Sequence, residues 1–431
     1  MIARLALSTL VVAALLHGAS GQTFQANYDE SKIPAFELPN PLVGLDGEPV
    51  ESATQWNQSR RAELLNLFRE HVYGVAPPPC AIRSQVVSTT TVFDGDATRS
   101  EVDVFFGEND DAPSMRLLTY VPSNAKSVPA FLGLNFQGNH SVDPDPSVTL
   151  NDQWMRDRRN ETTRGNRATE KARGVAASRW PVEMILRRGY GLVTIYYGDI
   201  DPDFDDGFKN GIHGVLGDSV DAEPEHRWGS IAAWAYGLSR ALDFLGSKEC
   251  PEIDAARVAV FGHSRLGKTS LWAGASDPRF AMVISNNSGC GGAALSRRAI
   301  GETIGRINTS FPHWFCDQFT RYNENENACP VDQHELLALI APRPVYVASA
   351  TADRWADPKG EFLSAVYADP VYRLLGTSGL GGAKPPSDPP PADTPINQGI
   401  IGYHLRTGKH DVKEYDWRQY LDFADRHLSG N

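Results

Sequence analysis

Cysteine is scarce in this chain of 431 residues. The five cysteines lie far apart for the most part, at Cys80, Cys250, Cys290, Cys316 and Cys329. An odd number leaves at least one thiol unpaired within the chain, and so few cysteines exclude a disulfide-rich scaffold. The chain also lacks a C-x-x-C pair or a His/Cys cluster, so it offers no structural zinc site. We expect no metal and no organic cofactor.

The chain also lacks an excess of basic residues. Lys and Arg number 41 against 53 Asp and Glu, which gives a formal net charge of −12 and an isoelectric point near 5.4. A surface of this charge repels nucleic acid and anionic membranes. We therefore expect no nucleic-acid and no membrane partner. We also expect a monomer.

Long apolar runs are missing except near the N-terminus. Arg4 precedes an apolar run over residues 5–16, and the small residues Ala19, Ser20 and Gly21 follow it. This run is too short to cross a bilayer, and the pattern is typical of a cleavable signal peptide. The sequence predicts a signal peptide over 1–21, one catalytic domain over 22–431, and a periplasmic or secreted protein.

What is present is an alternation of strand-like and helix-like segments, which predicts an α/β fold with a mainly parallel sheet covered on both faces. The first two strands look like an antiparallel hairpin. The predicted strands are 101–107, 115–121, 130–136, 191–197, 258–261, 282–285, 345–349 and 400–405. The predicted helices are 62–72, 230–245, 269–275, 361–373 and 415–428.

Two polar segments interrupt this alternation. Residues 141–178 are rich in charge and Asn, and residues 377–397 contain the run P-P-S-D-P-P-P. Both are typical of surface insertions on one domain. Substrate contacts often gather on loops at the rim of a sheet.

The octapeptide G-H-S-R-L-G-K-T at 262–269 matches two signatures. As a phosphate loop it would use Lys268 and Thr269 for phosphate and Mg²⁺, and as a nucleophile elbow it would expose Ser264 on a sharp turn. A phosphate loop usually follows the first strand and needs a later apolar strand that ends in Asp. Several predicted strands precede this one and no such strand follows. We therefore favour the serine hydrolase.

A serine nucleophile needs a histidine base and a carboxylate that orients it. In α/β-hydrolases the acid follows a late strand and the histidine precedes the last helix. Asp353 follows the predicted strand 345–349, and His410 lies just before the predicted helix at 415. The fold predicted from this order is an α/β-hydrolase three-layer sandwich. Asp357 remains an alternative acid, and an ordinary helix cap is the alternative role of Ser264.

A run of acidic residues at Asp201, Asp203, Asp205 and Asp206 hints at a calcium loop. Its glycine is one place late, and Ile212 stands where a bidentate Glu is needed. We interpret it as a solvated loop without metal.

The octapeptide and several other segments together resemble the glucuronoyl esterases of carbohydrate esterase family 15, in particular the bacterial branch. The further segments are RWP at 179–181, YYGDIDP at 196–202, NNSG at 286–289, GE at 301–302, FPHWF at 311–315, HELLALIAPRP at 334–344 and DRW at 353–355. The resemblance covers nearly all of the predicted mature chain. It implies hydrolysis of the ester between 4-O-methyl-glucuronic acid side chains of xylan and lignin alcohols.

The resemblance also implies roles for the catalytic residues. Ser264 matches the nucleophile and His410 the base, while Arg265 matches a residue that aids the oxyanion through its backbone N–H and its guanidinium. One departure concerns the acid. Many members carry a Glu where this chain has Asn287, which cannot be ionised, so the resemblance leaves Asp353 as the acid.

Five residues match positions of the family that contact or surround the substrate. Lys268, Glu302 and Trp355 match ligands of the glucuronoyl sugar, and His334 matches a histidine with a structural or substrate-positioning role. Ser310 stands where relatives often carry a Gln that contacts the sugar, and its shorter side chain loses that bond or replaces it with water.

Two other functions stay open at this point. An acetyl-xylan or other carbohydrate esterase would need only a small acyl pocket. An inactive carbohydrate-binding relative would account for the missing Glu.

Overall fold

The computed structural model of the protein describes residues 24–429 except 110, 124, 159, 218, 219 and 221. The predicted signal peptide over 1–21 lies outside the described residues. Among the described residues, no helix combines the length and the apolar character that crossing a membrane requires.

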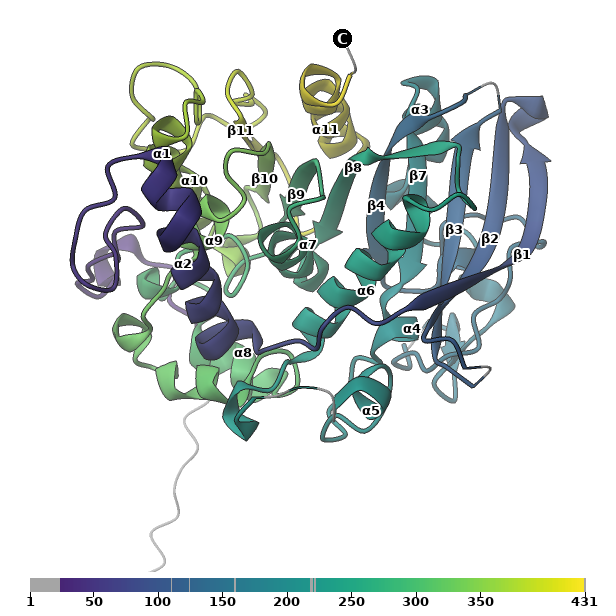
Figure 1. The fold of residues 1–431 in the computed structure, drawn as a ribbon, viewed down its shortest axis with the longest axis horizontal. Coiled ribbons are helices and arrows are strands. Elements are labelled where there is room, and N and C mark those ends of the chain that lie inside the picture. Colours follow the sequence, from purple (N-terminus) through teal and green to yellow (C-terminus); the bar gives the residue numbers. More distant parts are fainter. Residues whose placement is uncertain are drawn as a thin grey trace, which may run out of the picture.

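One large sheet organises the described chain, in the order β1-β2-β3-β7-β4-β8-β9-β10-β11. Strands β1, β2 and β3 lie at one edge (Figure 1), where each pairs antiparallel with its neighbours, while β7 and the strands beyond it run parallel. The strands are β1 Ile82–Val92, β2 Ala97–Phe106, β3 Ser114–Pro122, β4 Val128–Asn135, β7 Gly191–Tyr196, β8 Ile253–His263, β9 Met282–Asn286, β10 Val345–Ala350 and β11 Ile401–Arg406.

Helices cover both faces of the sheet. One face packs against α2, α6, α7, α9 and α10, and the other packs against α3 and α11. Figure 1 shows α6 and α7 lying side by side. The helices are α1 Ala53–Gln55, α2 Arg61–Phe68, α3 Val182–Arg187, α4 Tyr197–Ile200, α5 His213–Leu216, α6 Ser230–Leu245, α7 Arg265–Ser276, α8 Ile304–Ser310, α9 Gln333–Ala338, α10 Pro358–Leu374 and α11 Glu414–His427.

The buried strands divide their side chains between these two layers. In β8, Val258 and Val260 belong to the core under α6 and α7, whereas Ala259 and Phe261 belong to the core under α11. Because successive side chains of a strand point to opposite faces, a strand that is covered twice must be apolar throughout. This is why the central strands read as continuous apolar runs.

The predicted three-layer sandwich is confirmed, and each predicted strand is present. The strand β1 was missed, because its sequence I-R-S-Q-V-V-S-T-T-T-V is polar and much of it is exposed. The helix predicted from residue 269 begins earlier, at Arg265, since the chain turns sharply at Ser264 and enters the helix at once. Turns of π-helix at Trp56–Arg60 and Arg69–Tyr73 flank α2.

The two predicted insertions are loop-rich. Residues 141–178 contain the short hairpin of β5 Thr163–Arg164 and β6 Arg167–Ala168, and residues 377–397 form turns and irregular backbone. All five cysteines lie within the described residues, and each is a free thiol. Core packing and hydrogen bonds, without disulfides, therefore hold the described chain together.

Helix α7 packs very closely onto the end of β8. A Cβ atom added to Gly262 would lie 1.8 Å from the carbonyl oxygen of Leu266, which is backbone and has little freedom to move. A Cβ at Gly246, at the end of α6, would meet nothing nearer than 3.4 Å. Glycine at 262 thus permits the tight turn that carries Ser264.

We predict that Gly262→Ala lowers the free energy of unfolding by roughly 3 kcal/mol and abolishes activity, because the helix must move off the strand. Urea denaturation and an esterase assay on the refolded protein measure the two effects. Gly246→Ala is the matched control and should change the unfolding free energy by less than about 0.5 kcal/mol. A Gly262→Ala protein of unchanged stability and activity would show that the close approach is not required.

Candidate active site

Ser264 occupies the turn between β8 and α7 in a strained conformation. Its φ of 59° and ψ of −128° lie outside the regions that non-glycine residues usually adopt. Its N–H donates to the carbonyl of Asn286 at 2.9 Å, and its carbonyl accepts from the N–H of Gly267 at 2.8 Å. Strain of this kind is typical of a nucleophile elbow, where the turn lifts the hydroxyl above the sheet.

The side chains that a phosphate loop would use at this turn already have partners within the protein. The Lys268 ammonium donates to the carbonyls of Ser288 and Cys290 at 2.5 and 2.6 Å, and the Thr269 hydroxyl donates to the carbonyl of Arg265. Both side chains are buried. The groups that would hold phosphate and Mg²⁺ are therefore occupied by the protein itself.

The predicted base and acid meet at the ends of β10 and β11. Nδ1 of His410 lies 2.6 Å from Oδ2 of Asp353. The same oxygen accepts a hydrogen bond from the side-chain amide of Asn287 at 2.8 Å. A carboxylate bound to Nδ1–H leaves Nε2 as the nitrogen that accepts a proton. Asn287 thus does not replace the acid but helps to hold it.

Asp357 has a different partner. Its carboxylate lies 2.8 Å from Nε of Arg298, and both side chains are buried. Burial raises the pKa of Asp357 although Arg298 opposes this effect. The geometry therefore favours Asp353 over Asp357 as the partner of His410.

Two further groups, Glu361 and His263, lie near the pair of Asp353 and His410. The buried Glu361 carboxyl accepts from the N–H groups of Ser288 and Gly289, and burial raises its pKa to about 8. Its second oxygen accepts from the hydroxyl of Ser349 at 2.6 Å, so both oxygens are engaged by groups other than His410. The ring of His263 lies 4.5 Å from that of His410, and burial keeps the pKa of His263 well below its usual value. His410 consequently packs against a neutral ring.

Arg265 is the first residue of α7, so its N–H has no acceptor within the helix. Its guanidinium forms an ion pair with Asp203 and lies 4.7 Å from the centre of the Trp314 ring. Asp203 also accepts from His313 at 2.9 Å and from Trp314 at 2.8 Å. These bonds and the charge of Arg265 outweigh burial and hold the pKa of Asp203 far below its usual value.

The interpretation of residues 201–206 as a solvated loop was wrong for its first half. Asp201 and Asp203 are buried, and Asp201 lies 2.9 Å from Nδ1 of His213. The burial of Asp203 could have been expected from the sequence, because Arg265 lies at a turn between two buried elements and such an arginine needs a carboxylate partner.

Lys268, Glu302 and Trp355 form a second group next to the elbow. The ammonium of Lys268 lies 3.3 Å from a carboxylate oxygen of Glu302, whose N–H donates to the carbonyl of Trp355. Trp355 is exposed, with 38% of its surface accessible, whereas Lys268 is buried. Because an ammonium has three N–H donors and Lys268 already contacts three oxygens, it acts here as a support. Its contact with a sugar stays a prediction.

Comparisons with known proteins find relatives that match nearly the whole chain. The chain is 52% identical over 410 residues to "Carbohydrate esterase MZ0003" from an unknown prokaryotic organism. This match covers 94% of this chain and 92% of the relative. It also superposes with a TM-score of 0.87 on a promiscuous CE15 esterase from a marine bacterial metagenome, at 50% identity over 94% of this chain and 100% of the other.

The chain belongs to carbohydrate esterase family 15. The glucuronoyl esterase of Solibacter usitatus, another solved structure, is 47% identical over 93% of this chain and 100% of the other, with a TM-score of 0.85. The model of fungal glucuronyl esterases matches residues 223–376. The protein is thus a carboxylic ester hydrolase of the bacterial family 15 branch with the α/β-hydrolase fold.

The two remaining predicted substrate contacts of this family 15 esterase are His334 and Ser310. His334 is 1% exposed, and its Nε2 lies 2.8 Å from the carbonyl of Pro39. It is therefore enclosed against the N-terminal segment, which corrects its assignment as a substrate-binding residue and leaves a structural role. Ser310 is the half-buried last residue of α8, beside Phe311, whose ring lies 5.5 Å from the Arg265 guanidinium. Its contact with a sugar stays a prediction.

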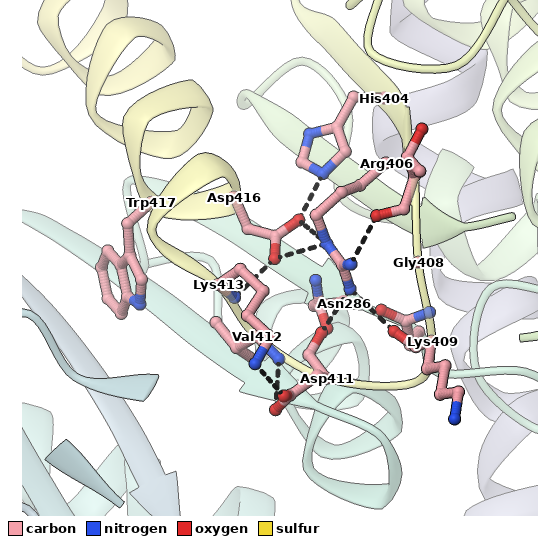
Figure 2. Close-up of polar contacts among 12 residues, drawn as sticks. Asn286, His404, Arg406, Gly408, Lys409, Asp411, Val412, Lys413, Asp416 and Trp417 are labelled. Carbon is pink, nitrogen blue, oxygen red and sulfur yellow. Dashed lines mark hydrogen bonds and ion pairs between the residues drawn. The ribbon is translucent and has the colours of Figure 1, made fainter. Parts of the chain in front are cut away.

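Arg406 is a residue of the site that the sequence analysis missed. Its buried guanidinium donates to the carbonyls of Lys409 and Asp411, on either side of His410, at 2.9 and 3.0 Å. It also pairs with the fully buried Asp416, which binds His404 at 2.8 Å (Figure 2). One planar cation thus ties the loop of the exposed base to the start of α11. No local sequence pattern predicts this role of Arg406, because a turn separates it from its partners Lys409, Asp411 and Asp416.

We predict that Arg406→Lys lowers kcat about 10- to 100-fold with little change in KM, because a lysine keeps the charge but does not span Asp416 and the loop carbonyls together. Steady-state kinetics on an activated ester measure the change, and circular dichroism checks the fold. Lys413→Ala, at an exposed position of the same loop that contacts Asp411, should stay within about twofold of the parent. An unchanged kcat in folded Arg406→Lys would contradict the positioning role.

Proposed function

We propose that this family 15 enzyme is a serine esterase that hydrolyses the ester between 4-O-methyl-glucuronic acid side chains of xylan and lignin alcohols through an acyl-enzyme. The observation that carries the proposal is the 2.6 Å contact of His410 with Asp353. His410 also packs against the ring of His263, the residue that precedes Ser264 and its strained turn. The names of the glucuronoyl esterase relatives support the acyl group.

In the first half of the reaction, the oxygen of Ser264 bonds to the ester carbonyl carbon while Nε2 of His410 takes the hydroxyl proton. Asp353 stabilises the imidazolium that forms. The carbonyl electrons move to the oxygen, which the N–H of Arg265 and its guanidinium stabilise. The bond to the alcohol then breaks, and His410 returns its proton to the departing oxygen.

In the second half, His410 takes a proton from water, and the water oxygen bonds to the acyl carbon. The bond to Ser264 breaks and the serine oxygen recovers the proton. Free glucuronate leaves the site. The buried Glu361 and His263 support this cycle without exchanging protons in it.

The acyl half of the substrate lies against Trp355 and Glu302 in this proposal. An exposed indole offers the flat apolar face on which sugar rings pack, and Glu302 supplies acceptors for hydroxyl groups. An acetyl group is too small to need this wall of Trp355 and Glu302, so the wall favours a glucuronate ester over an acetyl ester. The N-terminal pattern over residues 1–21 supports an exported enzyme, which would meet this polymer outside the cytoplasm.

We expect the parent enzyme to cleave benzyl glucuronate and Ser264→Ala to lose at least about 10⁴-fold in kcat, because the nucleophile is removed. Release of benzyl alcohol measures turnover, and acetylated xylan serves as the comparison substrate. A well-folded parent without activity on the glucuronate ester, or with a preference for acetyl groups, would refute the proposed substrate.

We also expect Asp353→Asn to lower kcat about 10⁴-fold, because an amide does not stabilise the imidazolium. Asp357→Asn is the matched control, four residues away and equally buried. It should keep activity within a few-fold but lose about 2 kcal/mol of stability, since among the described residues Glu30 is then the one charged partner left to Arg298. Near-full activity of Asp353→Asn would remove Asp353 from the triad.

A further inference from the structure

A cavity of about 300 Å³ adjoins the catalytic site on the side of Arg265. Rings of Phe136, Tyr197 and Phe311 form part of its wall, together with the guanidinium of Arg265. None of the three residues assigned to the glucuronoyl group, Lys268, Glu302 and Trp355, belongs to this wall. The cavity is therefore a separate space that shares the oxyanion arginine with the reacting centre.

Three arginines but a single carboxylate, that of Asp203, line the cavity. Arg156 and Arg158, from the insertion 141–178, both line it and are both exposed. Within the described part of the chain, neither forms an ion pair, whereas Arg265 has Asp203 as its counter-ion. A guanidinium NH₂ of Arg156 donates only to the backbone carbonyl of Asp203, at 3.2 Å. Two uncompensated cations thus face one cavity in a protein whose formal net charge is −12.

Like charges also act on Arg158. Although its side chain as a whole is exposed, partial loss of water around its guanidinium and the like charges of Arg179 and Arg265 lower its pKa. An anion bound at Arg158 would relieve this repulsion, and Arg156 lines the same cavity. Arginine binds carboxylates in pairs of parallel hydrogen bonds, and aromatic walls bind flat rings.

We propose that this cavity binds the alcohol half of the ester and favours an aromatic alcohol that carries a carboxylate. The inference rests on the proposed function, because an ester has only two halves and the acyl half is assigned to the wall of Trp355 and Glu302. Arg158 and Arg156 then bind the carboxylate, while the rings of Phe136, Tyr197 and Phe311 bind the aromatic ring.

The test compares three esters of glucuronic acid that differ at one position of the alcohol. Benzyl glucuronate carries no substituent, the 4-carboxybenzyl ester carries an anion, and the 4-carbamoylbenzyl ester has the same shape without charge. We expect kcat/KM for the carboxybenzyl ester to exceed that for the carbamoyl ester about tenfold, through a lower KM. Raising the salt concentration should reduce this ratio.

Arg158→Gln should bring the ratio of carboxybenzyl to carbamoylbenzyl ester close to one, and Arg158→Lys should restore part of it. Arg167→Gln is the matched control, because Arg167 is an exposed arginine of the same insertion that does not line the cavity. It should leave the ratio unchanged. These substitutions are at exposed side chains, so the fold should persist in each.

The outcomes separate this inference from the function on which it rests. Cleavage of the benzyl ester with no preference for the carboxylate, or a preference that survives in Arg158→Gln, overturns the assignment of the cavity and leaves the esterase proposal intact. Failure of the parent enzyme to cleave any of the three esters overturns the proposed function itself, and the assignment of the cavity with it.

Discussion

The short contact between Asp353 and His410 is the interaction on which the rest of this site depends. The His410 side chain is 41% exposed on a loop, whereas Asp353 is 5% exposed at the end of β10. An exposed imidazole keeps one orientation only when a rigid partner binds it. Here Asn287 donates a hydrogen bond to the carboxylate, the ring of His263 packs against the imidazole, and Arg406 binds the loop on both sides of His410. Elements far apart in the chain thus converge on one hydrogen bond.

Buried ion pairs do most of this positioning. Arg265 with Asp203, Lys268 with Glu302 and Arg406 with Asp416 each join a catalytic segment to a different part of the fold. Such pairs add little net stability because each charge loses its water, but breaking one is costly. They therefore specify geometry more than they stabilise it. Arg156 and Arg158 have no such carboxylate partner among the described residues, and this distinguishes the cavity that they line.

The position of the proposed acid follows from the parallel sheet. Asn287 comes directly after β9, and Asp353 follows β10. The two strands are neighbours and run parallel, so their carboxyl ends meet at one edge of the sheet. A carboxylate at either position can therefore lie near the same histidine, and in this chain the side-chain amide of Asn287 donates a hydrogen bond to Asp353.

The sequence by itself determined the sandwich, the positions of most of its strands along the chain, and Ser264, His410 and Asp353 as candidates, because apolar periodicity and turn residues are local properties. The polar edge strand β1 did not follow that pattern. Only the tertiary structure showed the order of the strands in the sheet, placed Asp353 against His410 and Asp357 against Arg298, enclosed His334, buried Asp203 against Arg265 and placed Arg406 beside the loop of the base. Each of these outcomes depends on contacts between segments distant in the chain, and spacing along a sequence carries no information about which carboxylate will face which cation.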